Sequence, residues 1–286
     1  MKKRTIIYTI LVSALLLGAT TAQAQRKQLA VGKVKTSTSI TADASAKGSA
    51  NSLMRVAEAI DGQLIDALNG TRKFEIIARS DLDALLEEGA FTGAGLQVGG
   101  SDYLLVPVID DYQDLIERAT FEGIGATAEK RKIRLGMVAR IYDSTSGKLI
   151  ESANFQLDNK NMEKLLSNSS RNGSFSDELL RKIAEEMGGK IANRVVDVIY
   201  PARVIALTGP QVTINRGDGT GIRVGQAWAV YALGEEMIDP DTGESLGQSE
   251  VKVGTVRIDR VSPKFSTGTI SENYGIAKGF VVRQLN

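Results

Sequence analysis

The spacing of apolar residues changes near residue 200, and the change divides the chain into two parts. In the first part, alternating or continuously apolar runs predict strands over 29–35, 74–79, 102–109, 133–143 and 148–157. Apolar residues at helical spacing predict helices over 52–68, 80–86 and 176–198. The polar and Gly-rich stretches between these elements predict loops over 36–51, 89–100 and 158–176.

The third predicted helix carries two consecutive glycines, Gly188 and Gly189, in its middle. Each Gly in a helix interior costs about 1 kcal/mol relative to Ala. The pair therefore predicts a bend in the helix or a close approach of another backbone.

After Pro201 the helical spacing disappears. The predicted strands there are 203–208, 211–216, 227–233, 249–261, 265–270 and 279–285, separated by Gly-rich turns. Short, closely spaced strands of this kind are typical of a small closed barrel. The expected fold class is α+β, with an N-terminal α/β domain over 26–200, in which helices pack on a mixed sheet, and a small all-β barrel domain over 201–286.

The first 24 residues have the parts of a secretory signal peptide. Residues 2–4 are basic, 6–17 are mainly apolar, and Ala22-Gln-Ala24 fits a cleavage site. An uncleaved N-terminal anchor is the alternative. Removing residues 1–24 takes away three of the 35 basic residues and none of the 34 acidic ones, which leaves 32 − 34 = −2. We therefore expect a periplasmic protein, peripheral to a membrane at most, without a nucleic-acid partner.

Two residue types are missing from the composition, Cys and His. Their absence excludes disulfides, thiolate zinc sites, a lipidated cysteine and catalytic triads that depend on His. We therefore expect no lipid anchor and no enzyme.

Two Gly-rich stretches, 89–100 and 123–130, resemble phosphate-binding loops only superficially. Each precedes a predicted strand, whereas a dinucleotide-binding loop follows one, and neither has the required Gly spacing. Both are interpreted as connectors, and no cofactor is expected.

Acidic residues gather at two places. Asp239, Asp241 and Glu244 could hold an ion, but their spacing is not that of a calcium-binding loop, and a polar turn is favoured. A second group, Asp110, Asp111, Asp114 and Glu117, follows a buried strand and is interpreted as a solvated strand end. A hydrolase using Asp110, Asp111 or Glu117 remains an alternative. The only Trp, Trp228, with Tyr231 nearby, is expected in the core or at a domain interface. No catalytic, cofactor-binding or metal-binding residue is assigned.

Residues 29–200 resemble the curli production assembly/transport component (CsgG-like) family. The similarity is carried, in order, by LIDALNGTRKFEIIARSDLDALLEE, GSDYLLVPVID and KIRLGMVARIYDSTSGKLIESANF, although Pro107 stands where the family has Gly. The resemblance implies an assembly or secretion component at the periplasm or outer membrane. Its founding member is a lipid-anchored, oligomeric curli secretion channel. This chain has no Cys for the anchor, and the segment after Phe155 is short and polar, so a soluble module is favoured and a channel is the alternative.

Residues 201–286 resemble the C-terminal barrel domain of flagellar assembly protein T. The similarity is carried by QVTINRGDGTGIRVGQAWAVYAL and by DPDTGESLG. Together the two resemblances imply a non-catalytic scaffold that forms homo-oligomers and has envelope partners, such as secretion or flagellar components.

Overall fold

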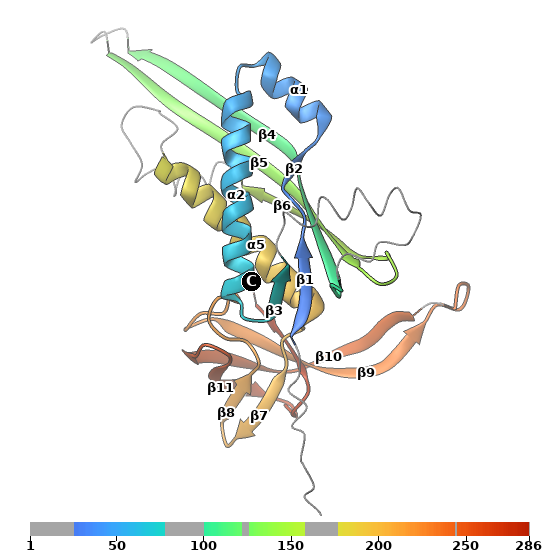
Figure 1. Cartoon of the computed structure of the whole chain (residues 1–286). Coiled ribbons are helices and arrows are strands. Elements are labelled where there is room, and N and C mark those ends of the chain that lie inside the picture. The colour runs from blue at the N-terminus through green and yellow to red at the C-terminus, as the bar shows by residue number, and fades with distance from the viewer. Residues whose placement is uncertain (1–25, 78–99, 122–125, 158–176, 244, 286) are drawn as a thin grey trace, which may run out of the picture.

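The computed structural model describes residues 26–77, 100–121, 126–157, 177–243 and 245–285, and the side chains of 116–132 lie outside this description. The described chain is a mixed α+β structure rich in strands, with two six-stranded sheets (Figure 1). The predicted signal peptide and the predicted helix over 80–86 lie outside the described residues. Within the described residues, no helix is long and apolar enough to cross a membrane.

The first sheet is mixed, as predicted. Its strand order is β3 (Phe74–Ile77), β1 (Lys27–Val31), β4 (Tyr103–Phe121), β5 (Ala126–Asp143) and β6 (Leu149–Leu157), with β2 (Lys35–Thr36) beside β4. Strand β1 is parallel to β3 and β4, whereas β4, β5 and β6 are antiparallel neighbours.

Two long helices, α2 (Ala50–Gly70) and α5 (Asp177–Ile199), pack against each other and against one face of this sheet. The apolar stripe that predicted α2 is the stripe it buries, namely Leu53, Val56, Ile60, Leu64 and Leu68. Gly188 explains part of the helix contact, because a methyl group there would lie 3.0 Å from the backbone nitrogen of Leu64. The Gly pair therefore marks a close approach of two backbones, as one of its two interpretations predicted.

Two expectations for the first part were wrong. Residues 36–51, expected to be a loop, contain the helix α1 (Thr38–Ala46) and the start of α2. The Ser37 hydroxyl caps α1. Ala44 is the only buried residue of this helix, so its sequence has no apolar stripe from which a helix could be predicted. The hairpin of β4 and β5 is also far longer than predicted, with strands of 19 and 18 residues.

The second sheet is antiparallel throughout and has its own core around Val212, Trp228, Val230 and Val256. Its strand order is β12 (Val281–Gln284), β9 (Ala227–Ile238), β10 (Ser245–Val261), β11 (Ser266–Asn273), β8 (Gln211–Ile214) and β7 (Val204–Thr208). The expectation of a closed barrel is wrong, because the sheet is open. Its edge strands are short, and they meet at one isolated bridge, Arg203 with Val281, and a few backbone hydrogen bonds beside it, without forming a ladder.

Strands β9 and β10 extend past their neighbours. Strand β12 pairs with β9 only from Trp228 to Tyr231, and β11 pairs with β10 only from Gly254 onward. The remaining ribbon projects away from the rest of the second sheet (Figure 1). We call residues 234–249 the arm.

Candidate functional site

The junction between the two parts of the chain is built around the glycine loop, residues 217–221. A methyl group at Gly219 would lie 2.5 Å from the Gly70 carbonyl oxygen, and one at Gly221 would lie 2.7 Å from Nδ2 of Asn193. Both glycines also have φ near +78°, where larger residues are strained. The loop therefore fits against the end of α2 and the side of α5 only because it lacks side chains at these points. The sequence indicated a turn here but not its contacts.

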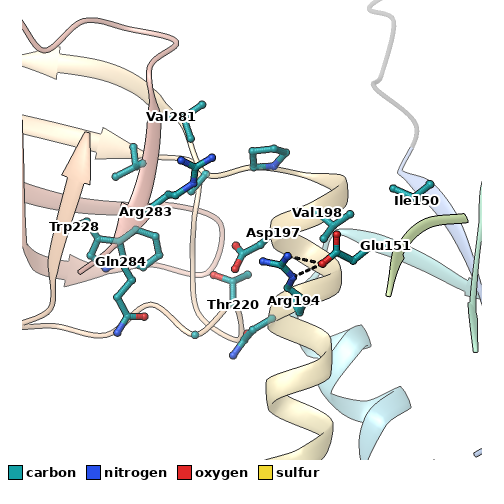
Figure 2. A pocket seen from close by; sticks show the side chains of 15 residues that line it. Ile150, Glu151, Arg194, Asp197, Val198, Thr220, Trp228, Val281, Arg283 and Gln284 are labelled. Atoms are coloured by element: carbon teal, nitrogen blue, oxygen red, sulfur yellow. Dashed lines mark hydrogen bonds and ion pairs between the residues drawn. The ribbon is translucent and has the colours of Figure 1, made fainter. Parts of the chain in front are cut away.

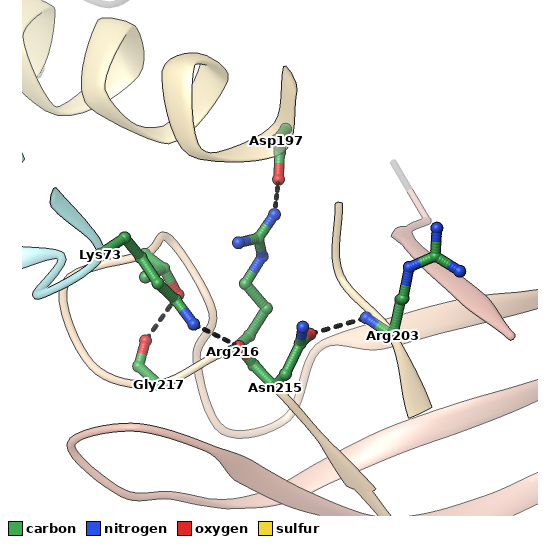
Figure 3. A network of polar contacts seen from close by, with 7 residues as sticks. Lys73, Asp197, Arg203, Asn215, Arg216 and Gly217 are labelled. Atoms are coloured by element: carbon green, nitrogen blue, oxygen red, sulfur yellow. Dashed lines mark hydrogen bonds and ion pairs between the residues drawn. The ribbon is translucent and has the colours of Figure 1, made fainter. Parts of the chain in front are cut away.

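A buried cation lies beside this loop (Figure 3). The Arg216 side chain is fully buried, and its Nη2 donates to Oδ1 of Asp197 on α5 at 2.5 Å. Its Nε and Nη1 have no hydrogen-bond partner among the described residues. Burial lowers the pKa of Arg216, and the Asp197 carboxylate opposes that change. The ion pair thus ties the second sheet to α5 at the cost of burying a charge.

Lys73, the residue before β3, adds a second link across the junction. Its Nζ donates to the carbonyl oxygen of Asn215 at 2.9 Å, and the amide oxygen of Asn215 accepts from the backbone N–H of Arg203 at 2.7 Å (Figure 3). Burial lowers the pKa of Lys73, and the nearby positive charge of Arg216 lowers it further. Two cations are therefore held close together at this junction.

A cavity of about 690 Å³ opens next to the network, between β6, α5 and the second sheet (Figure 2). Its charged lining residues are held in pairs. Glu151 pairs with Arg194 at 2.5 Å, Asp197 with Arg216, and Arg283 with Glu250. Because its carboxylates already neutralise cations, the described lining is better suited to hydrogen bonding than to nucleophilic or acid–base chemistry.

Trp228 lies where the sequence predicted, in the core and at the boundary between the two parts. It is buried in the second core, its Nε1 donates to Oε1 of Gln226 at 3.2 Å, and its ring borders the cavity. The Tyr231 ring lies 5.5 Å from the guanidinium of Arg283, at a distance that suits a cation–π contact.

The carboxylates from Asp110 onward are not at a strand end, which corrects that prediction. Strand β4 continues past them, with an irregularity in register between Ile109 and Asp111. Asp111 accepts from both Nε and Nη2 of Arg134 on β5, at 2.6 and 3.0 Å. Such a bidentate pair occupies the carboxylate that a hydrolase would need. Asp114 is half-buried on the same strand, and the side chain of Glu117 lies outside the described residues.

The acidic stretch at the tip of the arm forms a turn. Oδ1 of Asp239 accepts from the backbone N–H groups of Asp241 and Thr242, at 2.8 and 3.2 Å. Glu244 lies outside the described residues. Across the described part of the chain, no group of three or more acidic side chains is placed to hold a metal ion. Most of the two Gly-rich stretches is also outside the description, except that 126–130 belongs to β5.

Comparison with known proteins gives one family match. The model of the family "Curli production assembly/transport component CsgG" matches residues 13–181. No curated protein matches the chain. The family match ends within α5, so the similarity of residues 201–286 to flagellar assembly protein T stays a prediction.

Several solved structures are similar to parts of the chain. The PelC dodecamer from Paraburkholderia phytofirmans has a TM-score of 0.27 and 11% identity, over 57% of this chain and 88% of that one. The hypothetical protein CT253 from Chlamydia trachomatis has a TM-score of 0.35 and 11% identity, over 61% and 98%. Lipoprotein GNA1162 from Neisseria meningitidis has a TM-score of 0.28 and 14% identity, over 58% and 99%.

Proposed function

The chain belongs to the curli production assembly/transport component CsgG family, and from this membership we propose that it is a non-catalytic assembly or transport component of the cell envelope. The observation that carries the proposal is the family match over residues 13–181, which includes the first sheet, α1 and α2. The proposed location is the periplasm or the inner side of the outer membrane. Export through a signal peptide over 1–24 is part of the same proposal.

The junction supports a non-catalytic role. The charged groups around the cavity are engaged with one another, and Asp111 is engaged with Arg134. A hydrolase would need at least one carboxylate held free to accept or donate a proton. Asp111 is therefore a poor candidate for the catalytic carboxylate of a hydrolase, whereas Asp110 is exposed beside it and the side chain of Glu117 lies outside the described residues.

We also propose that the chain associates with copies of itself and with other envelope proteins, secretion or flagellar components among them. The chain has no Cys to carry a lipid anchor. Association with a membrane would then be peripheral and would depend on these protein contacts.

A curli-type secretion channel is the second candidate, and the β4–β5 hairpin is the observation that favours it. Strand β6 pairs with β5 only up to Leu135, so residues 113–121 and 126–134 extend as a separate two-stranded ribbon. Each of these stretches has about the 9–11 residues that a tilted strand needs to cross a bilayer. A lipid-facing strand alternates apolar with polar residues. The two stretches, QDLIERATF and ATAEKRKIR, instead place charged residues at consecutive positions.

One preparation separates these possibilities. The purified protein is first measured by light scattering and negative-stain imaging, and the same particles are then added to a planar bilayer. We expect particles of several chains that produce no conductance steps. Reproducible conductance would favour the channel, and a single-chain species at high concentration would contradict the proposed self-association.

A further inference from the structure

The arm, residues 234–249, packs against no other element of the described part of the chain. It is a ribbon of two strands that pair only with each other. Such a ribbon is marginally stable in water by itself. It also exposes three large apolar side chains, with 46% of Met237, 53% of Ile238 and 62% of Leu246 accessible. A ribbon of this kind gains stability when another surface covers it.

The arm is strongly acidic. It contains Glu235, Glu236, Asp239, Asp241 and Glu244 and no basic residue, a formal charge of −5. The rest of 201–286 has nine basic and four acidic residues, a charge of 9 − 4 = +5. The ion pairs at the root of the arm join Glu250 to Arg283 and Lys252 to Glu272. Among the described residues, Glu235, Glu236, Asp239 and Asp241 of the arm itself have no basic partner. The arm therefore presents a negative surface that a basic surface elsewhere would complement.

A matching surface lies at the other end of β10, and we call it the basic end. It consists of Arg223, Val224, Arg257, Arg260, Lys264 and Phe265. Backbone hydrogen bonds from Gly225 to Ile258 and from Ile258 to Gln226 hold the loop of Arg223 beside this end of β10. Val224 is 64% exposed and Phe265 is 41% exposed, so apolar surface is mixed with the positive charge.

The cations of the basic end are mostly free. Arg257 approaches Asp259 at 3.7 Å, but Arg223, Arg260 and Lys264 have no acidic partner among the described residues. The basic end thus complements the acidic arm in charge, and both surfaces expose apolar side chains that a contact between them would cover.

The two surfaces cannot meet within one chain. Strand β10 begins in the arm and ends at the basic end, and its 17 residues span roughly 50 Å at about 3.3 Å per residue. We propose that the arm of one chain docks on the basic end of a second copy, an inference that rests on the proposed self-association. Because the contact joins two different surfaces, it repeats head to tail and produces a ring if it closes or a filament if it does not.

A charge swap tests the contact. One variant reverses the arm (E235K/E236K/D241K), a second reverses the basic end (R223E/R260E/K264E), and a third combines all six changes in one chain. Their molar masses are measured by light scattering at low salt, where screening is weak. We expect each triple variant alone to fall to the mass of a single chain. The combined variant, and a 1:1 mixture of the two triple variants, should recover the mass of the wild type.

A matched control carries three charge reversals outside both surfaces, K33E/K148E/K278E. These lysines are exposed and have no ion pair among the described residues, so the control should keep the wild-type mass. Circular dichroism and thermal melting establish that every variant is folded.

Each result has one meaning. Triple variants that keep the wild-type mass would overturn the docking contact while leaving self-association intact. Loss of assembly without recovery in the swapped pair would show that the arm and the basic end do not contact each other. A wild type that is itself a single chain would overturn the proposed self-association and the contact together.

Discussion

Two neighbouring glycines in α5 allow the helix packing to be tested with a matched pair of substitutions, Gly188→Ala and Gly189→Ala. Both remove a Gly from a helix interior, and both should gain about 1 kcal/mol of helix propensity. Only Gly188 faces α2. A methyl group there would lie 3.0 Å from the nitrogen of Leu64 and 3.1 Å from the carbonyl carbon and oxygen of Gln63, whereas one at Gly189 would meet nothing within 4 Å.

The atoms that would clash at Gly188 belong to the backbone of α2, so the whole helix must move to make room. Overpacking of this kind costs about 1–3 kcal/mol. Gly188→Ala should therefore be neutral to about 2 kcal/mol less stable than the wild type, and Gly189→Ala about 1 kcal/mol more stable. Because the propensity gain is common to both, the difference between the two variants measures the cost of separating the helices.

Urea unfolding followed by circular dichroism measures both free energies of unfolding. In a thermal scan, each kcal/mol corresponds to about 2–4 °C in Tm for a chain of roughly this size. If the two variants differ by less than about 0.5 kcal/mol, the close approach of α2 and α5 at Gly188 does not exist as described.

Two further substitutions test the junction and one carboxylate of the second sheet. Asp197→Asn should cost about 1–3 kcal/mol because it leaves the buried Arg216 charge without its anion, a cost reduced by the partial exposure of Asp197. Arg216→Met should stay within about 1 kcal/mol of the wild type, since it also removes two buried guanidinium nitrogens that have no partner among the described residues. Equal losses of stability in both variants under urea would contradict this reasoning. Thr255 donates a hydrogen bond to the Glu272 carboxylate, and Lys252 adds a hydrogen bond and a positive charge, so the pKa of Glu272 lies below its usual 4.5. The stabilising contribution of Glu272 is therefore complete above pH 4.5 and is lost as the pH falls further. Glu272→Gln should therefore lessen the loss of stability on acidification, and an unchanged acid limb in urea titrations at several pH values would refute it.

The elements that the sequence predicted well are those in which each segment buries its own periodic stripe. Helix α2 buries Leu53, Val56, Ile60, Leu64 and Leu68, and these positions define its helical spacing without any knowledge of the fold. Helix α1 has no such stripe, and it forms on a Ser cap beside the sheet. The Ser- and Ala-rich composition of that segment therefore indicated a loop.

The long β4–β5 hairpin was missed for a related reason. Acidic residues from Asp110 interrupt the apolar run of β4, but the charge of Asp111 is compensated by Arg134 across the ladder. The two residues are 23 positions apart, so no pattern within one strand reveals the pairing.

The junction between the two parts of the chain is the feature that the sequence predicted least. The glycine loop has the composition of an ordinary turn, and its contacts with Gly70 and Asn193 join distant parts of the chain. The burial of Arg216 could not be predicted either, because its neighbours in the sequence are polar. The acidity of the arm, in contrast, can be read directly from residues 234–249, but its significance depends on β9 and β10 running past their neighbours.

We propose that this chain is a self-associating, non-catalytic part of an envelope assembly or transport machine. This proposal is tested most directly by crosslinking the protein in intact cells and measuring the native mass of the species recovered from the envelope fraction. We expect particles that contain several copies of the chain together with other envelope proteins. Recovery of a single, uncrosslinked chain from the cytoplasmic fraction would contradict it.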